Sequence, residues 1–146
     1  MSNNLAYQED MRTELINGEI VSMSPSATTK HNFIINNLML IFGNYLLGKN
    51  CTPFSDGVDV YLTEKNIFIP DMMIVCNPDK ISDDGIHGAP DLVVEVLSPS
   101  TTKNDRFRKK DVYEACGVRE YWLVDPSNKT LEQYILTDSK FTIKEI

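Results

Sequence analysis

The stretch DLVVEVLSPS (residues 91–100) has the pattern of a buried β-strand with one residue out of place, Glu95, in the middle of a run of Leu and Val. Successive side chains of a strand point to opposite faces. One face therefore carries Asp91, Val93, Glu95 and Leu97, and the other carries Leu92, Val94 and Val96. Because both faces are apolar around Glu95, the pattern predicts a strand that is covered on both sides, usually by helices.

A carboxylate in such a strand needs a partner. Left unpaired in an apolar interior it costs on the order of several kcal/mol, or its pKa rises until the group is neutral. The partner of Glu95 can be an Arg or Lys, a hydrogen-bond network, a bound metal ion, or water at an open end of the strand. The stretch by itself leaves these alternatives open.

The length of 146 residues predicts a single domain, 1–146, with one core. Its 42% hydrophobic and 24% charged residues are typical of a soluble globular protein. The N-terminal MSNNLAYQEDMRTEL has neither a basic start nor an apolar stretch, so we expect no signal peptide. The apolar segment FIINNLMLIFGNYLLG is interrupted by Asn and is too short to span a bilayer. These features predict a cytoplasmic protein.

The three cysteines, Cys51, Cys76 and Cys116, are odd in number and widely separated, and no Cys-x-x-Cys spacing occurs. This pattern argues against a disulfide framework or a zinc site. We expect each cysteine to be a small buried apolar residue.

The net charge of −7 disfavours loose attachment to nucleic acid or to anionic membranes. The basic residues are nevertheless clustered, because five of the 14 lie within eight positions just after the odd strand. They are Lys103, Arg106, Arg108, Lys109 and Lys110. Such a run forms either a solvated helix face or part of a functional site, and both interpretations stay open here.

Apolar residues repeat at helical spacing over residues 30–47, which predicts a helix that ends at Gly48. Its core-facing residues are expected to be Ile34, Leu38, Ile41, Phe42 and Tyr45. A second helix is predicted over 105–116, closed by Gly117. Before the first helix, TELINGEIVSMSPS predicts the end of a short helix, a turn at Asn17 and Gly18, and a strand over 20–23.

Strands are predicted for GVDVYLT and for NIFIPDMMIV, with an edge, bulge or bend at Pro70. REYWLVDPS is a further predicted strand, LEQYILT and KFTIKEI form a terminal hairpin, and the polar residues 77–90 form a loop. This order predicts a central mixed sheet with helices, that is, an α/β or α+β sandwich.

The helix after the odd strand should direct one lysine inward. At about 100° per residue, Val112, Tyr113 and Cys116 define the core-facing stripe, and Lys109 projects into its middle. Asp105 lies one turn earlier on the same side, whereas Lys110 points roughly 100° away, toward solvent. Lysine is uncommon on a buried stripe, and the alternative is that its amine reaches an edge of the core.

Asp71, on the apolar face of its own strand, joins Glu95 and Lys109 as a third charged group that points inward. Two nearby carboxylates repel each other in a dry site unless a cation lies between them. Magnesium suits carboxylates together with waters and a substrate phosphate. A nearby lysine can then hold the attacking water or offset charge on the phosphate, whereas a pure salt bridge leaves one acid without a counter-charge.

These residues resemble a known pattern. Pro70 and Asp71, followed by Glu95 in an apolar strand, resemble the PD-(D/E)XK nucleases. The strings PDLVVEVLSPSTTKNDRFRKKDVYEACGVREYWLVDPSNKTLEQY and TELINGEIVSMSPSATTKH are similar to the Uma family of endonucleases. The resemblance covers nearly the whole chain. It implies a restriction-endonuclease-like fold, which is a mixed sheet flanked by helices. It also implies Mg²⁺-dependent (or Mn²⁺-dependent) hydrolysis of phosphodiester bonds in nucleic acid. We expect DNA as the partner, no membrane partner, and a possible homodimer.

The resemblance also implies roles for single residues. Asp71 and Glu95 match metal-binding acids, and Lys109, four residues before Tyr113, matches a catalytic lysine. The wider superfamily has its lysine two positions after the second acid, where this chain has Leu97, so the lysine has moved to the following helix. Glu14 also matches a glutamate of the family and is a candidate additional catalytic residue that would reach the site from the first helix. His31 matches a family position, although a lone His near a helix start is more often a cap or core residue than a ligand. Beside the site, we expect Arg106, Arg108 and Lys110 to contact nucleic acid.

Tyr113, Tyr121 and Trp122 also match the family and are predicted to be core residues, and Asp125 is predicted to be a turn residue. Two functions follow. The first is a metal-dependent nuclease built on Asp71, Glu95 and Lys109. The second, motivated by the acidic net charge, is a non-catalytic module that binds protein or nucleic acid on the same fold. Its acids would be satisfied by Arg106, Arg108 or water.

Overall fold

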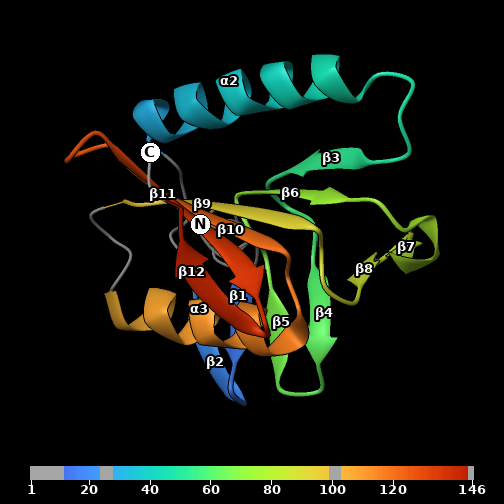
Figure 1. Ribbon diagram of the computed structural model, residues 1–146. Helices are drawn as coiled ribbons and strands as arrows, with labels where there is room; N and C mark the ends of the chain where they lie inside the picture. Colours follow the sequence, from blue (N-terminus) through green and yellow to red (C-terminus); the bar gives the residue numbers. More distant parts are fainter. Residues whose placement is uncertain (1–11, 24–27, 99–102, 145–146) are drawn as a thin grey trace, which may run out of the picture.

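The computed structural model describes residues 12–23, 28–98 and 103–144, which form two mixed six-stranded sheets and two α-helices (Figure 1). In sheet A the strand order is β2 (Glu19–Ser22), β1 (Thr13–Ile16), β5 (Asn66–Phe68), β4 (Val60–Thr63), β8 (Gly85–His87) and β7 (Ile81–Ser82). In sheet B it is β12 (Lys140–Ile143), β11 (Thr130–Thr137), β10 (Glu120–Asp125), β9 (Leu92–Val96), β6 (Met72–Val75) and β3 (Thr52–Ser55). No helix in these described ranges is long and apolar enough to cross a membrane.

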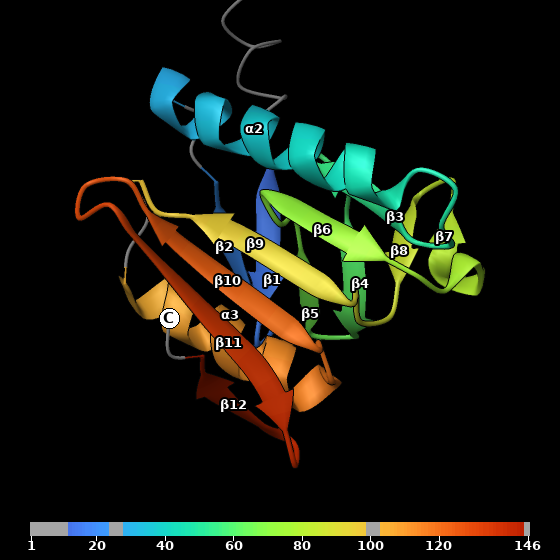
Figure 2. The ribbon, with the colours of Figure 1, turned by 45° about the horizontal axis from the view of Figure 1, so that its top comes forward.

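Sheet B lies between two helices, α2 (Thr29–Leu46) on one face and α3 (Lys103–Cys116) on the other (Figure 2). The core under α2 is built on Ile35, Met72, Ile74, Leu92, Val94 and Val96. The core on the α3 side joins sheet B to sheet A and includes Ile16, Phe68, Met73, Val93, Val112 and Tyr113. All five residues of β9 are buried, so the prediction of a strand covered on both faces is confirmed.

The α+β class is confirmed, but the single central sheet that the sequence predicted is replaced by two. The cause lies at residues 69–71, between β5 and β6. Pro70 has no N–H to donate to a ladder, and the chain leaves sheet A there and enters sheet B. The predicted strand NIFIPDMMIV is therefore two strands in different sheets.

The prediction of a helix end at Thr13–Ile16 is wrong, because these residues form β1, which pairs with β2 in a hairpin. Asn17 and Gly18 both have positive φ, 51° and 86°, as a two-residue hairpin turn requires. The Asn-Gly pair predicts the turn correctly, and in this hairpin the turn joins two strands, so the residues before it are a strand as well.

The predicted loop at 77–90 contains the short 3-10 helix η1 (Pro78–Lys80) and strands β7 and β8. β8 packs against β4 so closely that a Cβ at Gly85 would lie 2.3 Å from the carbonyl oxygen of Asp59. β7 and β8 have two and three residues, too few to show an apolar pattern in the sequence. The pairing of β8 with β4 depends on the close backbone approach at Gly85.

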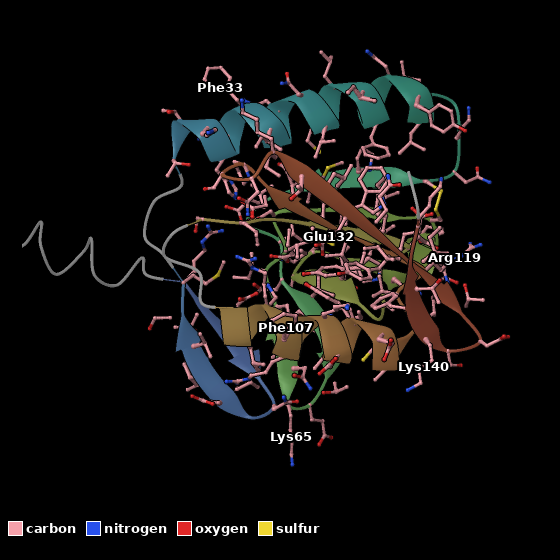
Figure 3. All side chains as sticks on the ribbon, turned by 60° about the vertical axis from the view of Figure 1, so that its left-hand side comes forward. Phe33, Lys65, Phe107, Arg119, Glu132 and Lys140 are labelled. Atoms are coloured by element: carbon pink, nitrogen blue, oxygen red, sulfur yellow. A yellow bond between two sulfur atoms is a disulfide. The ribbon has the colours of Figure 1, made fainter. Side chains whose placement is uncertain are left out.

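Helix α2 has the predicted extent, but part of its predicted core face is wrong. Ile35 is buried, while Ile41 and Tyr45 are 62% and 66% exposed. Leu38, Met39, Phe42 and Leu46 pack with Ile35 against sheet B. The outer side of the helix carries further apolar residues, among them Phe33, labelled in Figure 3. Since α2 is apolar around much of its circumference, its spacing does not fix which face is buried.

The expectation that no disulfide forms is also wrong, because Cys51 and Cys76 are bonded. The antiparallel register of β3 and β6 pairs Thr52 with Val75, and one step further it sets Cys51 opposite Cys76. Cys116 is a free, partly buried thiol. The sequence separation of 25 residues gave no sign of this contact, which depends on the strand pairing.

The remaining predicted elements are present. The helix expected over 105–116 is α3, the strand in REYWLVDPS is β10, and the terminal hairpin is β11 with β12. β10 lies parallel to β9, and α3 is the crossover between them. This connection brings the α3 side chains over the face of β9 that carries Glu95.

Candidate active site

Asp71 and Glu95 face each other across two antiparallel strands. β6 and β9 pair with Met72 opposite Val94, and one step further this register sets Asp71 opposite Glu95. Residues directly opposite in antiparallel strands have Cβ atoms about 4.5–5.5 Å apart. The Oδ2 atom of Asp71 accepts a hydrogen bond from the backbone N–H of Val96 at 2.7 Å, which ties the acid to β9. The two predicted metal ligands are therefore neighbours.

Lys109 lies between two buried carboxylates. Its Nζ donates to Oε1 of Glu95 at 3.1 Å and to Oε2 of Glu14 at 2.9 Å. Its side chain is 6% exposed, and the ammonium lies 5.3 Å from the centre of the Phe68 ring. Helical spacing predicted that Lys109 faces inward, and the structure places it there.

Glu14 reaches the site from β1 and not from a helix. Alternation along β1 puts Glu14 and Ile16 on one face, and both are buried. Oε2 of Glu14 accepts the backbone N–H of Ile69 at 2.8 Å in addition to the Lys109 ammonium. Glu14 therefore holds both the lysine and the backbone that leads through Pro70 to Asp71.

Tyr113 supports the same carboxylate from the next turn of α3. Its hydroxyl donates to Oε1 of Glu95 at 3.2 Å, and its ring packs edge-on against Phe68 with the centres 5.2 Å apart. The sequence predicted a core residue, and the ring is fully buried. The polar contact was missed, although the spacing of four residues from Lys109 is a signal for it.

His31 pairs with Asp71, with Nε2 of the ring 3.1 Å from Oδ1. His31 stands in the first turn of α2, where its backbone N–H is capped by the hydroxyl of Thr28. The hydrogen bond with Asp71 is the main cause that raises the pKa of His31 above its usual value. The pattern of the sequence contains no signal for this contact, because the two residues meet only when α2 packs on sheet B.

Negative charge is in excess at this site. Burial, with the nearby charges of Asp71 and Glu14, raises the pKa of Glu95 to about 8 even though Lys109 opposes the shift. For Lys109, burial alone lowers the pKa, but the carboxylates of Glu95 and Glu14 outweigh it and raise the pKa above the usual lysine value. Lys109 is thus a permanent cation, and it does not neutralise all three acids.

The donor set fits a hydrated divalent cation. Both hydrogen bonds that Glu95 accepts go to Oε1, so Oε2 has no donor from the described part of the chain. Within that part, no three acidic, histidine or cysteine side chains converge to enclose an ion by themselves. Each oxygen of Asp71 accepts one hydrogen bond, from His31 or from Val96, which leaves one lone pair on each for an ion. Two carboxylates with so few free positions suit Mg²⁺, which keeps several waters, better than a metal that needs a complete protein cage.

The three weakly predicted nucleic-acid contacts lie in different surroundings. Arg106 is buried on the α3 stripe. Arg108 donates to the carbonyl oxygen of Ile16 and to Glu19, so it ties α3 to the β1–β2 hairpin. Lys110 lies over the Tyr134 ring, with its Nζ 3.9 Å from the ring centre. The structure does not bring these three groups together into one basic surface. The side chain of Asp105 lies outside the described residues.

The other residues singled out are structural. Tyr121 is buried, and Trp122 packs against Phe42 of α2 with ring centres 5.5 Å apart. The carboxylate of Asp125 accepts hydrogen bonds from Ser127 and Asn128, as expected for a turn.

Comparison with known proteins agrees with this architecture. Residues 3–146 match the family model Uma2, described as "Putative restriction endonuclease". The uncharacterized protein slr1290 of Synechocystis is 29% identical over 138 residues, which cover 92% of this chain and 72% of the relative. A crystal structure from Anabaena variabilis, described as "a putative nuclease belonging to DUF820", superposes with a TM-score of 0.77 at 18% identity and covers 92% of this chain and 76% of the neighbour. This last likeness supports the fold.

Proposed function

Because the chain belongs to the Uma2 family, whose members resemble restriction endonucleases, we propose that it is a divalent-metal-dependent nuclease that hydrolyses phosphodiester bonds in nucleic acid. The observation that carries the proposal is the arrangement at Glu95. One oxygen accepts hydrogen bonds from Lys109 and Tyr113, while the other has no donor in the described part of the chain. The register of β6 and β9, continued by one step, sets Asp71 opposite Glu95.

Asp71 and Glu95 are the residues that would hold Mg²⁺ or Mn²⁺. When bound, such an ion lowers the pKa of a water and stabilises charge on a phosphoryl oxygen. The hydrogen bonds from Val96 to Asp71 and from Lys109 and Tyr113 to Glu95 fix both carboxylates in place before anything binds. A site held in this way does not need to reorganise during the reaction.

Lys109 has one donor left for the reaction. An ammonium has three N–H groups, and two of them serve Glu14 and Glu95. The third is available to orient the attacking water or to stabilise a phosphate oxygen. Because its pKa is raised, Lys109 acts as a hydrogen-bond donor and a positive charge and not as the base. Glu14 is a positioning residue, since it acts through Lys109 and the backbone of Ile69.

The proposal is tested by cleavage of supercoiled plasmid DNA and of labelled DNA and RNA oligonucleotides in Mg²⁺, in Mn²⁺ and in EDTA. We expect cleavage only with metal, and a loss of about 100-fold or more in Lys109→Met. Lys140→Met, at an exposed lysine of β12, serves as the matched control. Metal-dependent cleavage that continues at the wild-type rate in Lys109→Met contradicts the proposed role.

A second candidate is a non-catalytic binding module. It is favoured by the net charge of −7 and by the pairing of Arg12 with Asp56 and of Arg108 with Glu19, which removes free positive charge from the surface. Nucleic-acid or protein binding without cleavage under any metal condition supports this module. DNA as substrate, a homodimer and a cytoplasmic location remain predictions.

A further inference from the structure

Arg106 is a buried arginine that has no partner among the described residues. The residue is 9% exposed, and no hydrogen bond or ion pair joins its side chain to any residue in the described ranges 12–23, 28–98 and 103–144. A guanidinium carries five N–H donors. Arginine is rarely buried to this extent unless its guanidinium is paired. Arg108, two positions further along α3, shows the ordinary arrangement, because it donates to Ile16 and Glu19.

The position of Arg106 directs it to the candidate site. It precedes Lys109 by three residues and Tyr113 by seven, so the three side chains follow one another on the same side of α3. Both Lys109 and Tyr113 contact Glu95. The charges that act on Arg106 come from the same place: burial lowers its pKa, and Tyr121, Glu95, Asp125 and Asp71 act in the opposite direction. No acid of the described chain forms an ion pair with it.

The guanidinium stays accessible to a ligand. In the described part of the chain, the fully enclosed polar side-chain atoms without a partner are Nδ1 of His31 and the hydroxyl of Tyr121. The unpaired nitrogens of Arg106 are not among them, so they keep contact with solvent. Arg106 is therefore largely buried on the side of α3 that carries Lys109 and Tyr113, while its donors keep contact with solvent.

We propose that Arg106 binds the phosphate group of the nucleic-acid substrate at this site, with its N–H donors directed to the non-bridging phosphate oxygens. The planar fork of a guanidinium matches two phosphate oxygens at once. The phosphate oxygens of the substrate then accept the hydrogen bonds that no described residue of the protein accepts. The positive charge of Arg106 offsets the negative charge of the phosphate beside the carboxylates. This inference rests on the proposed function only in taking its substrate to be nucleic acid.

The test is equilibrium binding of fluorescent DNA and RNA oligonucleotides in EDTA, where no metal-dependent cleavage occurs. We expect Arg106→Met to weaken binding about tenfold and to reduce the salt dependence of the binding constant by about one ion. Arg106→Lys keeps the positive charge and loses the planar guanidinium, so its affinity for the oligonucleotides should lie between those of the wild type and Arg106→Met. Arg119→Met is the matched control, at an exposed arginine labelled in Figure 3.

Stability provides an independent readout. Because Arg106 has no partner among the residues that the structure describes, Arg106→Met should unfold at the same temperature as the wild type or at a higher one. This readout separates a binding role from a structural one. Equal binding by Arg106→Met, Arg119→Met and the wild type overturns the inference, as does a wild type that binds neither probe. Cleavage measured in parallel separates the two claims: weakened binding in Arg106→Met with no cleavage by the wild type retains the inference and rejects the nuclease.

Discussion

Ionisation of Glu95 costs free energy in the metal-free protein, because burial and the charges of two neighbouring acids raise its pKa from 4.5 to about 8. Between these values the folded protein keeps the proton and the unfolded chain has lost it. The free energy of unfolding therefore falls as the pH rises through this window, and Glu95 contributes no slope below or above it. The cost is on the order of a few kcal/mol at the alkaline end.

Glu95→Gln should remove this dependence. We expect urea unfolding in EDTA to show a decline in wild-type stability from about pH 5 to about pH 8, and a flatter profile for the variant. The difference between the two profiles isolates Glu95, since other groups titrate in both proteins. Parallel profiles would mean that Glu95 is ionised throughout this range in the folded protein.

Lys109 is the buried cation beside Glu14 and Glu95. Its removal leaves the Glu14 carboxylate without its counter-charge and takes a hydrogen-bond donor from Glu95, whose raised pKa keeps that group mostly protonated at neutral pH. We expect Lys109→Met to lower the free energy of unfolding by about 3–5 kcal/mol at neutral pH. Lys110→Met, which removes only a contact with the Tyr134 ring, should cost less than about 1 kcal/mol. Chemical denaturation measures the free energy of unfolding of Lys109→Met and Lys110→Met. Equal losses in the two variants would show that Lys109 is not the buried partner of Glu14 and Glu95.

At the residue scale, the sequence predicted three inward-facing charged groups of the candidate site but not how they meet. Apolar neighbours marked Asp71 and Glu95, and helical spacing directed Lys109 inward. The contacts of Glu14 and His31 depend on β1 and α2 packing against sheet B, and no local pattern encodes that packing.

The orientation of α2 follows from its packing on sheet B. Ile35 is 5% exposed and Ile41 is 62% exposed. The two residues thus form a matched pair on one helix. Ile35→Ala should lower the free energy of unfolding by about 2–4 kcal/mol, and Ile41→Ala by less than about 0.5 kcal/mol. Thermal melts that show a larger loss of stability for Ile41→Ala than for Ile35→Ala would mean that the buried face of α2 is the one that the sequence predicted.

The disulfide between Cys51 and Cys76 fastens the edge strand β3 to β6, whose N-terminal end follows Asp71. It closes a loop with a sequence separation of 25 residues, and its loss in Cys51→Ser/Cys76→Ser should cost about 3 kcal/mol. Cys116→Ser should leave the bond intact. Thiol titration of the unfolded, unreduced protein should find one free thiol, and three would contradict the bond. Disulfides are rare in reducing compartments, so this count also bears on the predicted cytoplasmic location.

At the element scale, long segments with a clear apolar repeat could be predicted. Very short strands, and the buried face of a helix that is apolar on more than one side, could not. α3, β9, β10 and the terminal hairpin carry patterns of their own. β7 and β8 are too short for a pattern, and α2 is apolar on more than one side. The sequence could not predict that NIFIPDMMIV divides between two sheets, because each half pairs with different strands that come together only in the folded chain.

At the scale of the whole molecule, the candidate site lies where both sheets and α3 meet. Glu14 comes from sheet A, Glu95 from sheet B, Asp71 from the link between the sheets, and Lys109 from α3. The class of the fold could be predicted from the order of elements, but two sheets that share one core could not. The site is a product of that junction, which explains why residues up to 95 positions apart contact each other.

The central claim is that Asp71 and Glu95 hold a divalent cation. The most direct measurement is the melting temperature of wild type, Asp71→Asn and Glu95→Gln against rising Mg²⁺ or Mn²⁺, with calorimetric titration for the stoichiometry. An ion at ten times its dissociation constant adds about 1.4 kcal/mol, which raises the melting temperature by a few degrees. We predict this rise, with one ion per chain, in the wild type and its absence in both variants. A rise of the same size in the variants, or no binding by the wild type, would contradict the claim.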